Sequence, residues 1–243
     1  MPLTALALVL LAAATPQTLE QDCAKGNAAA CDELGSRLRD GLGVRRDEGR
    51  AAALFRKSCE GKNAGGCADD ARALALGEGQ DADPRAALPR LEQLCKADSA
   101  RACGYLGEIF ARGIGGPQDA SRSDALLEGA CEKGAPRACV SLASILLHEG
   151  KSSRAEELAQ RGCDLGEVSG CTYLGDVFAR SHDVVRAGVY FSKACEAGSA
   201  HGCTGQGSLL IDSGVDAKRG RALLQKGCDG GDQQACDAVA KLK

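Results

Sequence analysis

Apolar and very small side chains recur along the chain every 32 to 36 residues, in a fixed register with pairs of cysteines spaced C-x7-C. Four residues after each second cysteine the residue is always glycine or alanine, and four residues before most first cysteines it is large and apolar. Residues four apart share one face of a helix. The pattern therefore predicts a helix A that begins just before each second cysteine and a helix B that ends at the next first cysteine. The small positions are Gly35, Ala71, Gly107, Ala143, Gly175, Gly207 and Ala240, and the large ones are Phe55, Leu91, Leu127, Phe191 and Leu224.

This period is typical of a solenoid of helical hairpins, in which each unit buries its apolar face against its neighbours. Because glycine inside a helix costs about 1 kcal/mol, the recurring small residue predicts that another helix backbone approaches closely there. From one second cysteine to the next first cysteine the interval is 28 residues in three units and 24 or 25 in the later ones. The extra residues stand in glycine-rich A-to-B turns, so longer loops are expected in the N-terminal half.

The fourteen cysteines are expected to form seven local disulfides. In a continuous helix, residues eight apart would be separated by about 12 Å, whereas a disulfide needs Cα atoms within roughly 7 Å. The chain must reverse between them, and in five pairs a glycine suited to a left-handed C-cap stands three residues after the first cysteine. Structural zinc is the alternative, but it takes four ligands and C-x7-C supplies two, so no metal is expected. The predicted pairs are Cys23 with Cys31, Cys59 with Cys67, Cys95 with Cys103, Cys131 with Cys139, Cys163 with Cys171, Cys195 with Cys203 and Cys228 with Cys236.

So many disulfides require an oxidising compartment. Residues 1–16 are predicted to be a secretory signal, because an apolar run over residues 3–14 ends in small side chains near Ala14. The run lacks a preceding Lys or Arg, and a membrane anchor is the alternative, although twelve residues are too few to span a bilayer. We expect residues 17–243 to form a single solenoid of about six hairpins plus partial terminal helices, in the periplasm or outside the cell.

The composition narrows the possible partners. The chain has no Trp, three Tyr and four Phe, so the core must consist mainly of Ala and Leu. Its formal net charge is −3, with acidic and basic residues interleaved, which argues against a nucleic-acid or anionic-membrane partner. We expect a monomer with no stable membrane span, no nucleic-acid partner and no cofactor.

Three segments carry a resemblance to a known family: Cys103–Gly107, Gly113–Asp119 and Cys131–Cys139. They resemble Sel1-like repeats, relatives of the tetratricopeptide repeat, and the added C-x7-C is similar to the Helicobacter cysteine-rich proteins, whose repeats are disulfide-linked αα-hairpins. The resemblance covers nearly the whole chain after the predicted signal, although Asp70 and Gln206 stand where the repeat usually has leucine. It implies an all-α, right-handed superhelical solenoid of αα-hairpins stapled by disulfides.

For function, the resemblance implies two classes. The first is a scaffold whose concave groove, lined by the A helices, binds a protein or peptide. The alternative is a β-lactamase, a penicillin-binding hydrolase, as members of the cysteine-rich family have been labelled. The sequence contains no S-x-x-K and no H-x-H-x-D, and its histidines, His148, His182 and His201, are widely separated. We therefore assign no catalytic residue and favour the scaffold.

If the tetratricopeptide analogy holds, A-helix residues two, five and nine positions after the second cysteine face the concave side. In two units they repeat an aromatic, acidic and basic order, which could hold an extended peptide by stacking and charge pairing. Alternatively, the same side chains contact neighbouring hairpins of their own chain. The predicted partner-binding residues are Tyr105, Glu108, Arg112, Tyr173, Asp176 and Arg180.

Overall fold

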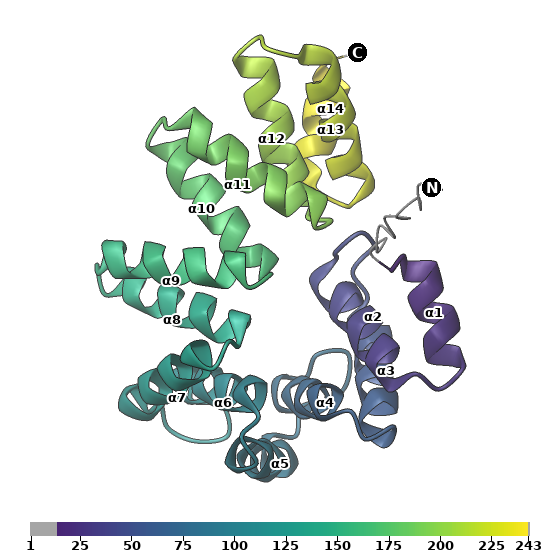
Figure 1. Ribbon diagram of the computed structural model, residues 1–243, viewed down its shortest axis with the longest axis vertical. Helices are drawn as coiled ribbons and strands as arrows, with labels where there is room; N and C mark the ends of the chain where they lie inside the picture. Colours follow the sequence, from purple (N-terminus) through teal and green to yellow (C-terminus); the bar gives the residue numbers. More distant parts are fainter. Residues whose placement is uncertain (1–13, 243) are drawn as a thin grey trace, which may run out of the picture.

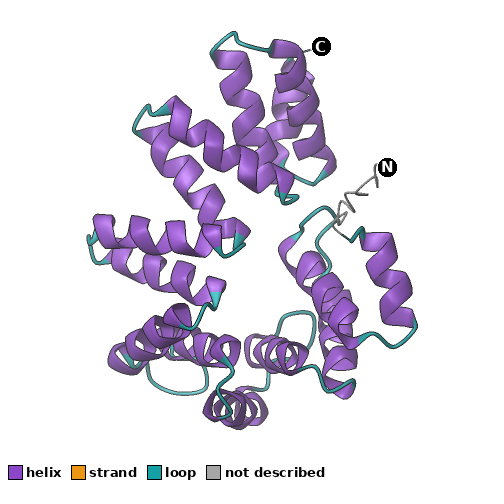
Figure 2. Cartoon of the chain, in the orientation of Figure 1, coloured by secondary structure: helices purple, strands orange, loops and turns teal. Residues whose placement is uncertain are grey.

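The computed structural model describes residues 14–242, which form fourteen helices and no strand, arranged as a curved stack (Figures 1 and 2). This confirms the all-α superhelical solenoid. The helices are α1 (Pro16–Ala24), α2 (Ala28–Asp40), α3 (Glu48–Glu60), α4 (Ala64–Leu76), α5 (Pro84–Lys96), α6 (Ala100–Arg112), α7 (Ala120–Glu132), α8 (Pro136–His148), α9 (Ser152–Asp164), α10 (Val168–Arg180), α11 (Val184–Glu196), α12 (Ala200–Asp212), α13 (Ala217–Asp229) and α14 (Gln233–Lys241).

The helices begin and end where the cysteine register predicts. Even-numbered helices are the A helices, and each begins three residues before a second cysteine. Odd-numbered helices are the B helices, and each ends one residue after a first cysteine. Every helix from α2 to α13 has 13 residues, so the change in repeat length lies wholly in the A-to-B loops. These loops have seven residues after α2, α4 and α6, but only three or four in the later hairpins.

Each B-to-A junction reverses the chain within three residues. The third residue after every first cysteine has a positive φ, and five of the seven are glycines as predicted. Lys62 (φ 62°) and Asp98 (φ 67°) take this conformation in the other two units. The reversal brings paired Cα atoms to between 4.3 and 4.8 Å.

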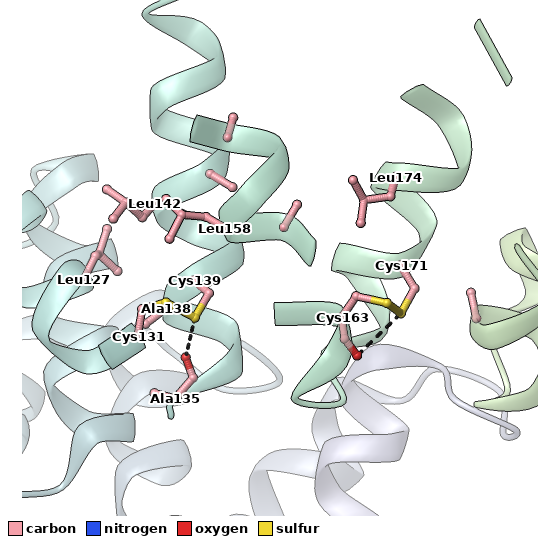
Figure 3. Packing of buried hydrophobic residues seen from close by; sticks show 14 of the residues in the cluster. Leu127, Cys131, Ala135, Ala138, Cys139, Leu142, Leu158, Cys163, Cys171 and Leu174 are labelled. Carbon is pink, nitrogen blue, oxygen red and sulfur yellow. Dashed lines mark hydrogen bonds between the residues drawn. A yellow bond between two sulfur atoms is a disulfide. The ribbon is translucent and has the colours of Figure 1, made fainter. Parts of the chain in front are cut away.

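All seven predicted disulfides form, and none of them joins two different junctions. Figure 3 shows two of the bonds beside the leucines that pack around them. In most pairs the second cysteine is in the core or close to it, so the bond is part of the packing between helices. The bonds are Cys23–Cys31, Cys59–Cys67, Cys95–Cys103, Cys131–Cys139, Cys163–Cys171, Cys195–Cys203 and Cys228–Cys236.

The core is a row of small apolar clusters that are rich in alanine and leucine. The large residue four positions before the first cysteine is buried in each unit where it was predicted. In the hairpin of α8 and α9 this position is Ala159, which is also fully buried. Because alanine buries little area, this core gains less hydrophobic stabilisation per residue than a leucine-rich one.

At three of the four A-helix positions where the small residue is glycine, Gly35, Gly107 and Gly175, it makes room for a side chain, which corrects the expectation of backbone contact there. A Cβ atom on Gly35 would lie 2.7 Å from the Phe55 ring, and one on Gly175 would lie 2.6 Å from the Phe191 ring. Only at Gly207 is the nearest atom a backbone atom, the carbonyl oxygen of Gly220 at 2.8 Å. Within a hairpin, the large B-helix residue therefore packs over the position where the A helix has no side chain.

The two ends of the curved stack meet. The first A-to-B loop approaches the junction before α12, where the Gly43 N–H donates a hydrogen bond to the Gly198 carbonyl oxygen over 3.1 Å. Figure 1 shows the first and last hairpins facing each other. Gly198 has a φ of 95°, and a Cβ atom there would lie 2.7 Å from the Gly43 nitrogen. This contact joins the first hairpin to the junction before α12, so the curved stack closes on itself.

The predicted signal, residues 1–16, lies outside the described residues except for its last three. Helix α1 begins at Pro16, and the Thr15 hydroxyl accepts a hydrogen bond from the Thr18 N–H over 3.2 Å. Among residues 14–242, none of the helices is long and apolar enough to cross a membrane.

Candidate functional site

The A helices line three adjoining cavities on the inside of the curve. Their volumes are about 430, 540 and 490 Å³, and together they extend from α2 to the start of α12. We call their shared surface the inner groove and define it by the polar residues that line more than one cavity. These residues are Arg39, Asp40, Arg112, Arg137, Glu167 and Ser169. Arg137 lines all three cavities.

A buried carboxylate at one side of the inner groove ties three successive A helices together. Asp69 on α4 has no exposed side-chain surface. It accepts hydrogen bonds from Arg39 Nη1 on α2 at 2.5 Å, and from Arg101 Nη1 and the Tyr105 hydroxyl on α6 at 2.7 and 2.5 Å. Burial opposes ionisation of Asp69, but Arg39, Arg101 and the Tyr105 hydroxyl lower its pKa below the ordinary value. Asp69 is therefore an ionised brace between repeats.

A second carboxylate shares the same arginine. Asp32 Oδ2 accepts from Arg101 Nη1 over 2.9 Å, while Asp32 Oδ1 is buried without a hydrogen-bond partner among the described residues. Burial is the main cause that raises the pKa of Asp32, and repulsion from the Asp69 carboxylate adds to the rise. Arg101 acts in the opposite direction but does not cancel it. A proton added to the pair therefore goes to Asp32.

Two ion pairs and a hydrogen bond link α4, α6 and α8. Arg72 donates to Glu108 over 3.3 Å and to Glu78 over 2.6 Å. Glu108 also accepts a hydrogen bond from the Ser141 hydroxyl over 2.6 Å. Part of the charge that lines the inner groove is therefore already neutralised by contacts within the chain.

The structure brings the first predicted set, Tyr105, Glu108 and Arg112, onto the inner side of α6, but their environments differ. Tyr105 is only 4% exposed, its hydroxyl is bonded to Asp69, and the Arg72 guanidinium lies 5.2 Å from the centre of its ring. Its ring is therefore not available to stack on a peptide, and the predicted intramolecular alternative describes it. Arg112 is exposed, lines two cavities, and forms no ion pair with any described residue.

The second predicted set lies on α10 outside the three cavities. Tyr173 is half-buried against the core, Asp176 accepts a hydrogen bond from His201, and Arg180 is exposed. Roles for Glu108, Arg112 and these three residues in partner binding stay predictions.

A polar position two residues before the second cysteine was not predicted as part of the site from the sequence. In four successive units this position carries Arg101, Arg137, Ser169 and His201, and each of them lines the cavities. Arg137 Nη2 donates to Asp40 Oδ1 over 3.3 Å, whereas its Nε is buried without a partner among the described residues. The recurrence of polar side chains inside the C-x7-C loop was the available signal.

His201 links the last three A helices. Its Nε2 lies 3.0 Å from Asp176 Oδ1 on α10, and its Nδ1 lies 3.5 Å from Asp232 Oδ2, whose carboxylate caps α14. The hydrogen bond to Asp176 raises the pKa of His201 above its ordinary value of 6.5 despite partial burial, and Asp232 adds to this rise. A neutral imidazole donates from only one nitrogen, so the charged form suits this site better.

This contact predicts a pH-dependent contribution to stability. Because the folded pKa lies above the unfolded one, the contribution is fully present below about pH 6.5 and is lost as the pH rises through the folded pKa. We expect it to stay under about 1 kcal/mol, since the imidazole is partly exposed and its charge is screened by solvent. Urea unfolding of wild type and His201→Gln at acid and mildly alkaline pH measures it: the stability difference should shrink at the higher pH. A difference that does not change with pH would contradict this assignment.

The charged and polar side chains of the inner groove can hold a ligand by ion pairs and hydrogen bonds. Among the described residues no group of three or more His, Cys, Asp and Glu side chains is placed to hold a metal ion. All fourteen cysteines are in disulfides, so none supplies a thiolate.

The chain is similar in sequence to a family of repeat proteins and similar in fold to solved structures. The sequence profile of the Sel1 repeat matches residues 28–63, 100–134, 170–199 and 204–232, more than half of the chain. The crystal structure of a Sel1 repeat protein from Oxalobacter formigenes is similar with a TM-score of 0.66 at 19% identity, covering 93% of this chain and 69% of that one. The immunity protein Pa5087 from Pseudomonas aeruginosa is similar with a TM-score of 0.56 at 17% identity, covering 84% of this chain and 83% of that one.

At these identities the structural likeness shows the fold alone. No curated protein sequence matches the chain significantly. None of the comparisons supports β-lactam hydrolysis. The seven local disulfides agree with the resemblance to the Helicobacter cysteine-rich proteins.

Proposed function

Because the chain belongs to the Sel1 repeat family, we propose that it is an exported scaffold that binds an extended segment of a protein partner in the inner groove. The observation that carries this proposal is the continuity of the groove. Three cavities of about 430 to 540 Å³ adjoin along successive A helices; all three share Arg137, and two of them also share Arg112 and Ser169. A continuous polar channel of this size suits several successive residues of a peptide better than one compact ligand.

The stapled fold also favours binding. Each A helix is held to the preceding B helix by a disulfide, and Asp69 fixes three A helices relative to one another. A groove that is already rigid loses little conformational entropy when a partner binds. The charged braces therefore serve binding by holding the remaining groove side chains in place.

The cystine content supports export to the periplasm or the cell exterior, since such bonds persist in oxidising compartments. Cleavage near Ala14 would leave α1 intact together with its Thr15 cap. The mature protein would then be a single solenoid that begins with α1 and acts as a monomer.

Site-specific photo-crosslinking tests the proposed function. A photoreactive amino acid replaces Ser169, which is exposed in the groove, or Gln93, which is exposed on α5 away from the three cavities. We expect envelope extracts of the producing cells to give a discrete crosslinked protein with the Ser169 probe and not with the Gln93 probe. The same products from both positions, or none from Ser169, would overturn the proposal.

A further inference from the structure

We propose that the inner groove selects acidic segments, and that a partner carboxylate sits between Arg112 and Arg137. This inference rests on the proposed function and names the partner chemistry. The largest of the three cavities is lined by five arginines and three carboxylates, whereas the whole chain has a net charge of −3. The groove is thus a positively charged region of a negatively charged protein, which favours an anionic segment there.

Three of these five arginines are already paired within the chain, and one of them, Arg46, pairs with Glu48 at an exposed site. Arg39 donates to both oxygens of Asp40, over 3.0 and 2.8 Å, and to Asp69. Arg72 is held by Glu78 and Glu108. Neither guanidinium can turn to a ligand without breaking a buried ion pair.

Arg137 and Arg112 differ from them. Arg137 donates one side-chain hydrogen bond among the described residues, to Asp40. At 3.3 Å this bond is the longest of the three that Asp40 accepts. A buried donor without a partner is unfavourable, and Arg137 Nε is such a donor among the described residues. Arg112 stands at the end of α6 and lines two of the cavities that Arg137 also lines, without an ion pair to the described residues.

The neighbouring groups fit a carboxylate. Ser144 adds a hydroxyl donor to the wall shared by Arg112 and Arg137. The Ser169 hydroxyl on the same wall already donates to Glu167 over 2.7 Å, and the negative charge of Glu167 opposes the entry of further anions. Charge-assisted hydrogen bonds to arginine are short and directional, and the proposed carboxylate accepts such bonds from both guanidinium groups.

Three fluorescein-labelled peptides test the inference: six consecutive Glu, Gln or Lys residues between glycines, measured by fluorescence anisotropy with the oxidised protein. We expect the Glu peptide to bind at least tenfold more tightly than the other two, and its affinity to fall as salt rises. The net charge of the whole protein would give the opposite order and favour the Lys peptide. Equal or weaker binding of the Glu peptide, or no binding at millimolar concentration, would overturn the inference.

Paired variants locate the site. The double variant Arg112→Gln with Arg137→Gln is expected to lower Glu-peptide affinity at least tenfold. The control double variant, Arg85→Gln with Arg221→Gln, removes the same charge from exposed positions on α5 and α13 and should leave the affinity within twofold. If the first variant unfolds, Arg112→Gln alone tests the site, since Arg112 is exposed, with a loss of about threefold expected.

Two outcomes of these measurements would count against the site. Equal losses of Glu-peptide affinity in both double variants would contradict its location between Arg112 and Arg137. Tight binding of the Lys or Gln peptide together with a Ser169 crosslink would reject acidic selection while leaving the scaffold function in place.

Discussion

Reduction of the seven disulfides is expected to lower the melting temperature of the protein by tens of degrees. Each bond closes a loop of about nine residues, and the chain-entropy model assigns roughly 2.5 kcal/mol to such a closure. Ordinary domains have a total stability of about 5 to 15 kcal/mol. The clusters of buried alanine offer little hydrophobic stabilisation to replace the lost bonds. Thermal melts of oxidised protein and of reduced, alkylated protein, followed by circular dichroism, give the comparison.

Single-bond variants add a positional test. Repeats contact only their neighbours, so stability propagates along the stack. Removing Cys131–Cys139 interrupts the stack in its middle, whereas removing Cys228–Cys236 loosens only the terminal hairpin. The alanine pair at the first site should therefore lower the melting temperature more than the pair at the second. An unchanged melting curve after confirmed complete reduction would show that the alanine and leucine packing is sufficient alone.

The fold could be predicted from the sequence because the disulfide spacing repeats in register with the helical pattern. A single C-x7-C pair leaves many pairings open, but seven copies with a small residue at one fixed distance define the hairpin and its junctions. From the sequence, the left-handed turn could be recognised only in the five units that have glycine at this position. Lys62 and Asp98 adopt the same backbone conformation, because the disulfide and the capped helices on either side hold the turn.

The inner groove was predicted less well, because its chemistry depends on contacts between repeats. Tyr105 and Asp69 occupy the same position of successive A helices, 36 residues apart. From the sequence, both face inward and both could contact a partner. In the fold both side chains are buried between neighbouring repeats, and Asp69 accepts a hydrogen bond from the Tyr105 hydroxyl. A repeat alignment gives the face on which a side chain lies, while its burial depends on the curvature of the stack, which brings Arg39 and Arg101 together over Asp69.

The second largest effect is expected for Asp69→Ala, which should destabilise the protein by about 3 to 5 kcal/mol, as for the loss of one partner from a buried ion pair. Arg39 would lose its bond to α4, Arg101 would keep only Asp32, and the Tyr105 hydroxyl would be left without its acceptor. Urea unfolding followed by circular dichroism measures the difference. Asp164→Ala is the matched control: Asp164 pairs with Lys193 over 3.2 Å at an exposed site, where removal should cost less than about 1 kcal/mol.

A double-mutant cycle shows whether the cost of Asp69→Ala comes from uncompensated charge. If the Arg39 charge is destabilising once Asp69 is gone and only Asp40 remains as its acceptor, Arg39→Met in the Asp69→Ala background should recover part of the lost stability, because methionine fills the space without a buried charge. The same Arg39→Met change in wild-type protein should destabilise, because it removes one of the two arginines that keep Asp69 ionised. Purely additive effects in the cycle would show that Asp69 acts only through packing. The charged brace between α2, α4 and α6 would then not be what holds the groove in shape.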